Sequence, residues 1–190
     1  MAVALRFLVV GFALALAACT PSHTVATGQA VAGKIHLQDG AEVERANQRL
    51  LSHQTQVCLV SDQRMESRAV LEAMQRGFSG YFLAVGIDSA PLDLASVLQN
   101  PPCPGAQYVF YVELTELQCS GERKPDGQCT QQRLPKQLAI TVINHDDRSL
   151  ADRIKLSLSR GLLSSGSEQD RLQRAFEQLA ALLTGAGSSA

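Results

Sequence analysis

Serine, histidine and acidic side chains are the groups from which this chain could build nucleophilic or acid–base chemistry. Ser79 lies in a Gly-Phe-Ser-Gly stretch at 77–80, which lacks the spacing of a nucleophile elbow and is typical of a helix-to-strand turn. His145, Asp146 and Asp147 could form an acid–base or metal cluster, but adjacent acids between two apolar runs are usually a solvated hairpin turn. The sequence therefore predicts no catalytic residue and no enzymatic activity.

Acidic and aromatic residues further along the chain also lack a catalytic arrangement. Glu113 and Glu116 should fall on opposite sides of a strand, because successive side chains alternate. Tyr108, Phe110 and Tyr111 favour core and sheet packing over a ligand-stacking platform. No Gly-Lys-Ser/Thr occurs, and no Gly-x-Gly-x-x-Gly follows an expected strand, so we predict no nucleotide and no other cofactor.

The first 18 residues have the pattern of an export signal. One positive charge precedes an apolar run at 7–18, which has the length of a signal-peptide core and is too short to span a membrane. The run ends Leu-Ala-Ala-Cys at 16–19, which resembles the lipobox of bacterial lipoproteins. The resemblance implies cleavage between Ala18 and Cys19, with an ordinary secretory leader as the alternative.

The same resemblance implies a lipid on the thiol of Cys19 and a second fatty acyl group on its amino nitrogen. Several acyl chains, at about 0.8 kcal/mol per buried methylene, make a stable membrane anchor. Thr20 in place of aspartate implies transfer to the outer membrane of a Gram-negative cell. The small, polar, aperiodic stretch that follows predicts a flexible tether, so residues 19–33 are the lipidated cysteine and its tether.

Four cysteines remain after Cys19, and export would place them in an oxidising compartment. Three pairings are possible. We favour Cys119 with Cys129, because the intervening Gly, Pro and Asp-Gly residues indicate a surface loop between two strands. Cys58 with Cys103 follows by elimination. A zinc site is the alternative, but no Cys-x-x-Cys spacing occurs and the histidines are scattered, so we predict no metal.

Length and charge restrict the class of protein. Removing the 18-residue leader from 190 residues leaves 172, enough for one domain that buries about 70% of its unfolded surface. The formal net charge is −1, so no basic footprint for nucleic acid is present. We predict one globular domain over 34–184, followed by a disordered tail at 185–190.

Hydrophobic patterning predicts the elements of this domain. Apolar runs at 56–61 and 81–86 flank an amphipathic helix from about Met65 to Gly77, with the glycine as its C-cap, and so predict a parallel β-α-β unit. Pro91 opens a short helix to about Leu98, and 43–51 suggests an extra helix. Strands over 108–117, 134–142 and 150–158 alternate and predict an antiparallel meander. A capping box from Ser165 to Glu168 then precedes a C-terminal helix. The predicted class is α/β (α+β), a single domain with a mixed sheet of about five strands and helices packed on it.

This layout resembles a group of envelope lipoproteins with a domain similar to the amino-terminal domain of TolB. The group includes lipoprotein activators of penicillin-binding proteins and the Pel-type polysaccharide export lipoprotein. The Cys58-Leu-Val stretch, the helix after it, Cys103-Pro and the strand from Tyr108 also resemble small Gram-negative outer-membrane lipoproteins of no established activity. The likeness covers about 54–183. The chain departs from it in having no tryptophan and in its added loop at 119–129.

Two classes of function fit these observations. The first is a non-enzymatic accessory or assembly factor, held by its lipid at the periplasmic face of the outer membrane, that contacts an envelope protein or a copy of itself. The second is a module for a small ligand or a glycan, or a cryptic hydrolase, which uses a cleft near the Cys103 loop and His145. The first is favoured, because the anchor and tether are accompanied by no catalytic motif.

Overall fold

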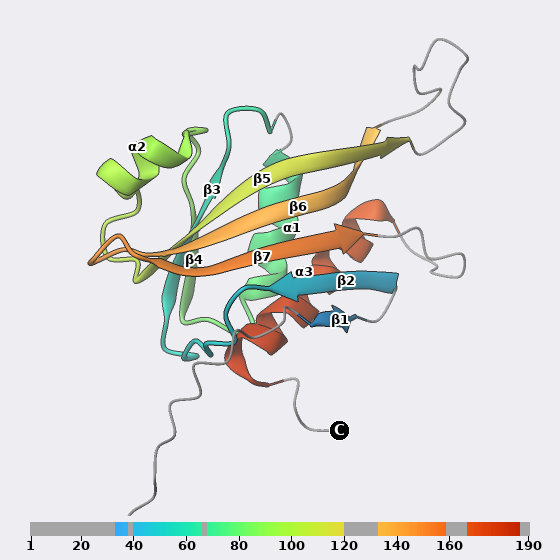
Figure 1. Ribbon diagram of the computed structural model, residues 1–190, viewed down its shortest axis with the longest axis horizontal. Coiled ribbons are helices and arrows are strands. Elements are labelled where there is room, and N and C mark those ends of the chain that lie inside the picture. Colours follow the sequence, from blue (N-terminus) through green and yellow to red (C-terminus); the bar gives the residue numbers. More distant parts are fainter. Residues whose placement is uncertain (1–32, 38–39, 66–67, 120–132, 159–166, 187–190) are drawn as a thin grey trace, which may run out of the picture.

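The computed structural model describes residues 33–37, 40–65, 68–119, 133–158 and 167–186. These form one α+β domain in which a mixed seven-stranded sheet has the order β1-β2-β7-β6-β5-β3-β4 (Figure 1). The strands and helices follow along the chain as β1 (Lys34–His36), β2 (Ala41–Arg45), β3 (Gln56–Ser61), α1 (Arg68–Phe78), β4 (Ala84–Ile87), α2 (Leu94–Gln99), β5 (Tyr108–Cys119), β6 (Arg133–Asn144), β7 (Leu150–Leu158) and α3 (Glu168–Thr184).

The predicted parallel unit is present. β3 pairs in parallel with β4 on one side and with β5 on the other, and α1 connects β3 to β4. β3 is apolar on both faces because helices cover both, as is typical of parallel strands. β4 begins at Ala84, three residues later than the apolar run suggests. α2 begins at Leu94, where Asp93 accepts a hydrogen bond from the backbone N–H of Ser96 and caps the helix.

The predicted meander is also present, since β5, β6 and β7 pair antiparallel in succession. Their alternation divides the side chains between two faces of the sheet. Phe110, Leu138 and Ile154 are among those that enter the main core, while the residues between them face outward. This outward surface becomes the site described below.

The predicted strand number and the extra helix at 43–51 are wrong. The sheet has two more strands, and the first three residues of that segment belong to β2, which pairs antiparallel with β7. The Ala-Glu-Val-Glu-Arg sequence alternates between buried and half-buried, so its period is that of a strand. The three exposed residues of β1 are ordered by pairing with β2 and by ion pairs from Lys34 to Glu42 and Glu44, at 3.7 and 3.4 Å.

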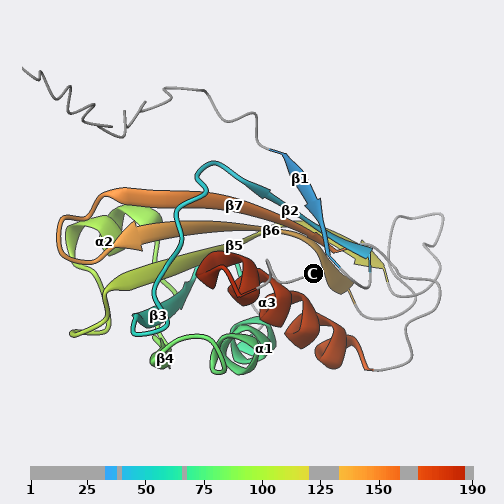
Figure 2. The same cartoon turned by 90° about the horizontal axis from the view of Figure 1, so that it is seen from below.

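Two helices cover one face of the sheet and one covers part of the other. α1 and α3 lie side by side beneath the sheet in Figure 2, while α2 lies on the opposite face at the β3 end. Rings of Phe78, Phe110 and Phe176 pack edge to face at the centre of the main core, with centroids 5.4 and 6.4 Å apart from Phe78. The outer face is therefore covered at one end, and nothing in the described part of the chain covers the rest.

Gly77 is inside α1 and is not its C-cap. A Cβ atom at this position would lie 2.8 Å from the backbone oxygen of Gln173 and from the backbone nitrogen of Glu177, both in α3. The residue is glycine because the two helices approach too closely for a side chain. The capping box of α3 also differs from the expected one, since Ser167 and Asp170 form it and Ser165 lies outside the described residues.

Candidate functional surfaces

The predicted lipidation and cleavage residues, Ala18 and Cys19, lie outside the described residues, as do the leader, the tether up to residue 32 and the end of the tail. Cys129 lies outside them as well. Cys119, at the end of β5, is disulfide-bonded. No helix within the described ranges is both long enough and apolar enough to span a membrane.

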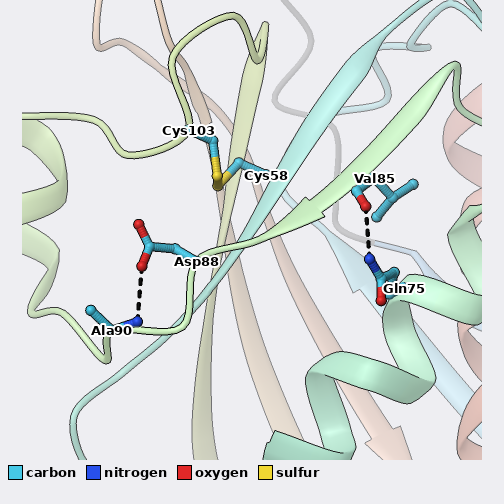
Figure 3. The surroundings of a disulfide bond; sticks show 6 residues. All are labelled: Cys58, Gln75, Val85, Asp88, Ala90 and Cys103. Atoms are coloured by element: carbon cyan, nitrogen blue, oxygen red, sulfur yellow. Dashed lines mark hydrogen bonds between the residues drawn. A yellow bond between two sulfur atoms is a disulfide. The ribbon is translucent and has the colours of Figure 1, made fainter.

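A disulfide joins Cys58 in β3 to Cys103. This is the pair that was predicted by elimination, once Cys119 is assigned to Cys129. Cys103 lies in the loop between α2 and β5. Figure 3 shows the disulfide on one side of β4 and Gln75 of α1 on the other, where Gln75 donates a hydrogen bond to the carbonyl of Val85. The disulfide therefore fixes the α2 loop to the outer face of the sheet.

A small second core lies under α2 on this outer face. It contains Cys58, Val60, Val97, Val109, Tyr111 and Ile143. The hydroxyl of Tyr111 donates a hydrogen bond of 3.0 Å to Asp62. Burial, followed by this hydrogen bond and the nearby carboxylates, raises the pKa of Tyr111 well above its usual range, so the hydroxyl stays protonated and remains a donor. Tyr111 and Phe110 therefore act in packing, as the sequence indicates.

The serine and acidic candidates lie apart from one another. Ser79 directly follows α1, and its hydroxyl donates to the carbonyl of Gln75, as at an ordinary helix terminus. Asp147 accepts hydrogen bonds in the β6–β7 turn, chiefly from Ser149, and these lower its pKa. His145 is half-buried, and its Nε2 atom has no hydrogen-bond partner among the residues that the structure describes. No group of three or more histidines, cysteines or acids in the described ranges is placed to hold a metal ion.

Simple alternation does not place Glu113 and Glu116 relative to each other in β5. A register shift between Leu114 and Glu116 interrupts the pairing of β5 with β6. Glu116 forms an exposed ion pair with Lys136. Glu113 stays on the outer face and borders a groove there.

One cleft in the described part of the chain is polar and has a volume of about 480 Å³. It is bordered by the segment before β3 and by the adjacent ends of β5 and β6. Tyr108, Gln107, Asn144 and Asp146 line it on the sheet side, while Arg49 and Gln54 are among the residues opposite. His145 is absent from its lining, so the structure brings only part of the predicted His145 cleft together.

The second cleft is a groove of about 600 Å³ on the outer face of β5, β6, β7 and β2, beside the start of α2. We call it the outer-face groove and define it by Glu44, Glu113, Ala139, Thr141, Arg153 and Lys155. Thr141 is only 6% exposed although it points away from the main core, which marks the floor of the groove. This groove was not predicted from the sequence, because the predictions for these strands used their apolar positions and not the polar positions between them.

A buried ion pair joins β2 to β7, the two strands that border the groove on the side away from α2. Arg45 and Asp152 approach to 2.8 Å, with side chains 7% and 5% exposed. Asp152 also accepts hydrogen bonds from the backbone N–H groups of Asn47 and Arg153. Arg45 and Asp152 are 107 positions apart, so the local sequence does not predict their pairing. It fastens the chain leaving β2 onto β7.

These features define the class of protein, which is an α+β domain with helices over one sheet face and an open groove on the other. No protein-family model and no curated protein matches the sequence. Solved structures that share the fold include a single-site variant of PelC from Paraburkholderia phytofirmans and PelC itself, both dodecamers. The variant has a TM-score of 0.53 at 15% identity and covers 76% of this chain and 99% of its own. The corresponding values for PelC are 0.52, 14%, 76% and 97%.

Proposed function

We propose that this protein is a non-enzymatic accessory lipoprotein of the outer membrane that works as an assembly of copies at the periplasmic face. The observation that carries the proposal is the fold shared with PelC, whose structures are dodecamers and match over nearly their whole length. Closed homo-oligomers use the same surfaces on every copy, and each copy therefore needs exposed surface that its own chain leaves uncovered, such as an open sheet face. The lipobox-like residues at 16–19 supply the anchor.

The absence of an assembled site among the described residues supports a non-enzymatic role. Ser79, His145 and the acids at 146–147 occupy ordinary helix-end and turn positions. Fixed loops and a covalently attached α2 segment suit a rigid interaction module. Such a module needs a defined surface and no proton-transfer group.

The anchor is tested by changing Cys19 in cells. Cys19→Ser should leave the leader uncleaved and remove lipid labelling by a radioactive fatty acid. Thr20→Asp is the matched variant, because it keeps the lipidated cysteine and should move the protein to the inner-membrane fraction. Normal lipid labelling of the Cys19→Ser protein would refute the anchor.

Assembly is tested on the full chain extracted in mild detergent. Light scattering with correction for bound detergent should give a mass of several copies. A monomer at every concentration, with no same-chain product after crosslinking in intact cells, would refute the assembly.

A second function, binding of a small polar ligand or glycan, is favoured by the polar cleft of about 480 Å³. Side-chain amides, a carboxylate and the ring of Tyr108 are groups that commonly bind sugar hydroxyls and ring faces. Tyr108→Ala combined with Asp146→Ala should abolish retention of the protein on an envelope glycan column. Unchanged retention of this variant would exclude the cleft.

A further inference from the structure

The outer-face groove is the part of the sheet that the domain leaves open. Helices α1 and α3 cover the core face, while α2 and the Cys103 loop cover the outer face over β3 and the adjoining parts of β5 and β6. The groove begins beside the first residue of α2 and extends across β6 and β7 to β2. Ala139 and the buried Thr141 give it an uncharged floor.

The charges at the rim of this groove balance. Glu44 and Glu113 are acidic, and Arg153 and Lys155 are basic. In the described part of the chain, Glu113, Arg153 and Lys155 form no ion pair, while Glu44 is joined to Lys34 at 3.4 Å. A strongly charged partner, such as a nucleic acid or an anionic lipid surface, would meet two like charges here, and like-charge contacts are costly.

A surface with unpaired acid on one strand and unpaired base on a neighbouring strand complements itself. In a two-fold contact the same patch serves both partners, so residue i of one copy meets residue j of the other and the reverse. Glu113 lies on β5 and Arg153 on β7, on opposite sides of β6. Rotation by 180° about an axis that lies parallel to the sheet, above β6, brings β5 of each copy over β7 of the other, so that Glu113 meets the basic residues of β7, Arg153 among them.

We propose that the outer-face groove is a self-association surface whose occupant is the same groove of a second copy. The inference rests on the proposed function, because it locates one contact of the proposed assembly. Two sheets pack face to face over the Ala139–Thr141 floor, and the Glu113–Arg153 pairs close the rim on both sides. The pairs set the orientation of the copies, and exclusion of water from the floor supplies the favourable free energy.

The test uses charge reversal in the full chain, with light scattering in mild detergent as the measurement. Glu113→Arg and Arg153→Glu should each weaken self-association by about tenfold or more, because like charges then meet across the two-fold axis. An equimolar mixture of the two variants should restore the wild-type mass, as should the double variant. Arg64→Glu, at an exposed turn outside the groove, is the control and should change nothing.

A photo-crosslinking amino acid at Ala139 gives an independent measurement in intact cells. Wild-type rims should yield a product that contains two copies of this chain, and either single charge reversal should remove it. A product with a different protein at Ala139, or wild-type assembly by both single variants, would overturn the inference and leave the proposed assembly standing. A wild-type chain that is monomeric throughout would overturn both.

Discussion

Replacing Asp152 by asparagine should lower the free energy of unfolding by about 3–5 kcal/mol, the usual cost of leaving one member of a buried ion pair without its partner. The two side chains are nearly isosteric, so packing around position 152 changes little. The asparagine oxygen can keep the two backbone N–H bonds that Oδ1 accepts. Its NH₂ group then replaces Oδ2 and faces the guanidinium donors of Arg45.

The magnitude follows from the contacts that are lost. Nε and one terminal nitrogen of Arg45 each lie 2.8 Å from Oδ2 of Asp152. Hydrogen bonds to a charged group contribute about 1.5–3 kcal/mol each, which brackets the expected loss. Water cannot replace them, because both side chains are less than a tenth exposed. A domain of this size should lose about 6–20 °C in Tm.

The assay is urea unfolding of the detergent-extracted full chain, followed by circular dichroism, for Asp152→Asn, Arg45→Met and the double variant. The double variant should cost at least about 1 kcal/mol less than the sum of the single variants, because it leaves no unpaired charge. Lys136→Met, which breaks an exposed pair with Glu116, should cost at most about 1 kcal/mol. An Asp152→Asn cost below 1 kcal/mol at an unchanged m-value, or additive single variants, would refute the reasoning.

Three further predictions concern stability. Gly77→Ala should cost about 1–3 kcal/mol in urea unfolding, because its Cβ meets the backbone of α3, whereas Gly80→Ala meets no atom within 4 Å and should be neutral; equal effects would disprove the close helix contact. Replacing Cys58 and Cys103 together by serine should cost about 4 kcal/mol, the chain-entropy value for a loop closed across 45 positions, and reducing agent should then have no further effect at this bond. Hydrogen bonds from Ser167 depress the pKa of Asp170. The contribution of this carboxylate to stability is therefore complete above the ordinary pKa of 3.8 and is lost as the pH falls through the depressed pKa. Asp170→Asn should flatten the decline of the urea midpoint in that pH range, and an unchanged decline would contradict the capping role.

The elements that could be predicted from sequence are those with an unambiguous period. The apolar run of β3 and the alternation in β5 to β7 each match one structure only, and the structure contains all four strands. The segment from 43 to 51 was ambiguous because Val43 and the leucines at 50 and 51 also fit a helical spacing. Its residues up to Arg45 form part of β2, and this strand is fixed by pairing with β7. The alternation at 41–45 covers only five residues, which is too few to decide between strand and helix without this pairing.

Functional surfaces were harder to predict than elements for a related physical reason. The outer-face groove is formed by residues from four strands, and its members become neighbours only when the sheet order is known. Gly77 illustrates the same limit, since a glycine near the end of a helix pattern has the appearance of a C-cap until α3 is placed against it. The disulfide is the exception, because an even number of cysteines restricts the pairings before any fold is known.

The pairing of β2 with β7 also determines when the domain can finish folding. Glu42 lies opposite Ser157, 115 positions later, so β2 leaves the translocating or synthesising machinery long before its partner strand exists. Long-range pairing of this kind is slow, and an unpaired strand invites aggregation in the interval. Charges at Lys34, Glu42 and Glu44 discourage such pairing with other chains. The β1–β2 edge of the sheet therefore cannot close until β7 has emerged, and chaperones that act on the emerging chain would meet this edge unpaired.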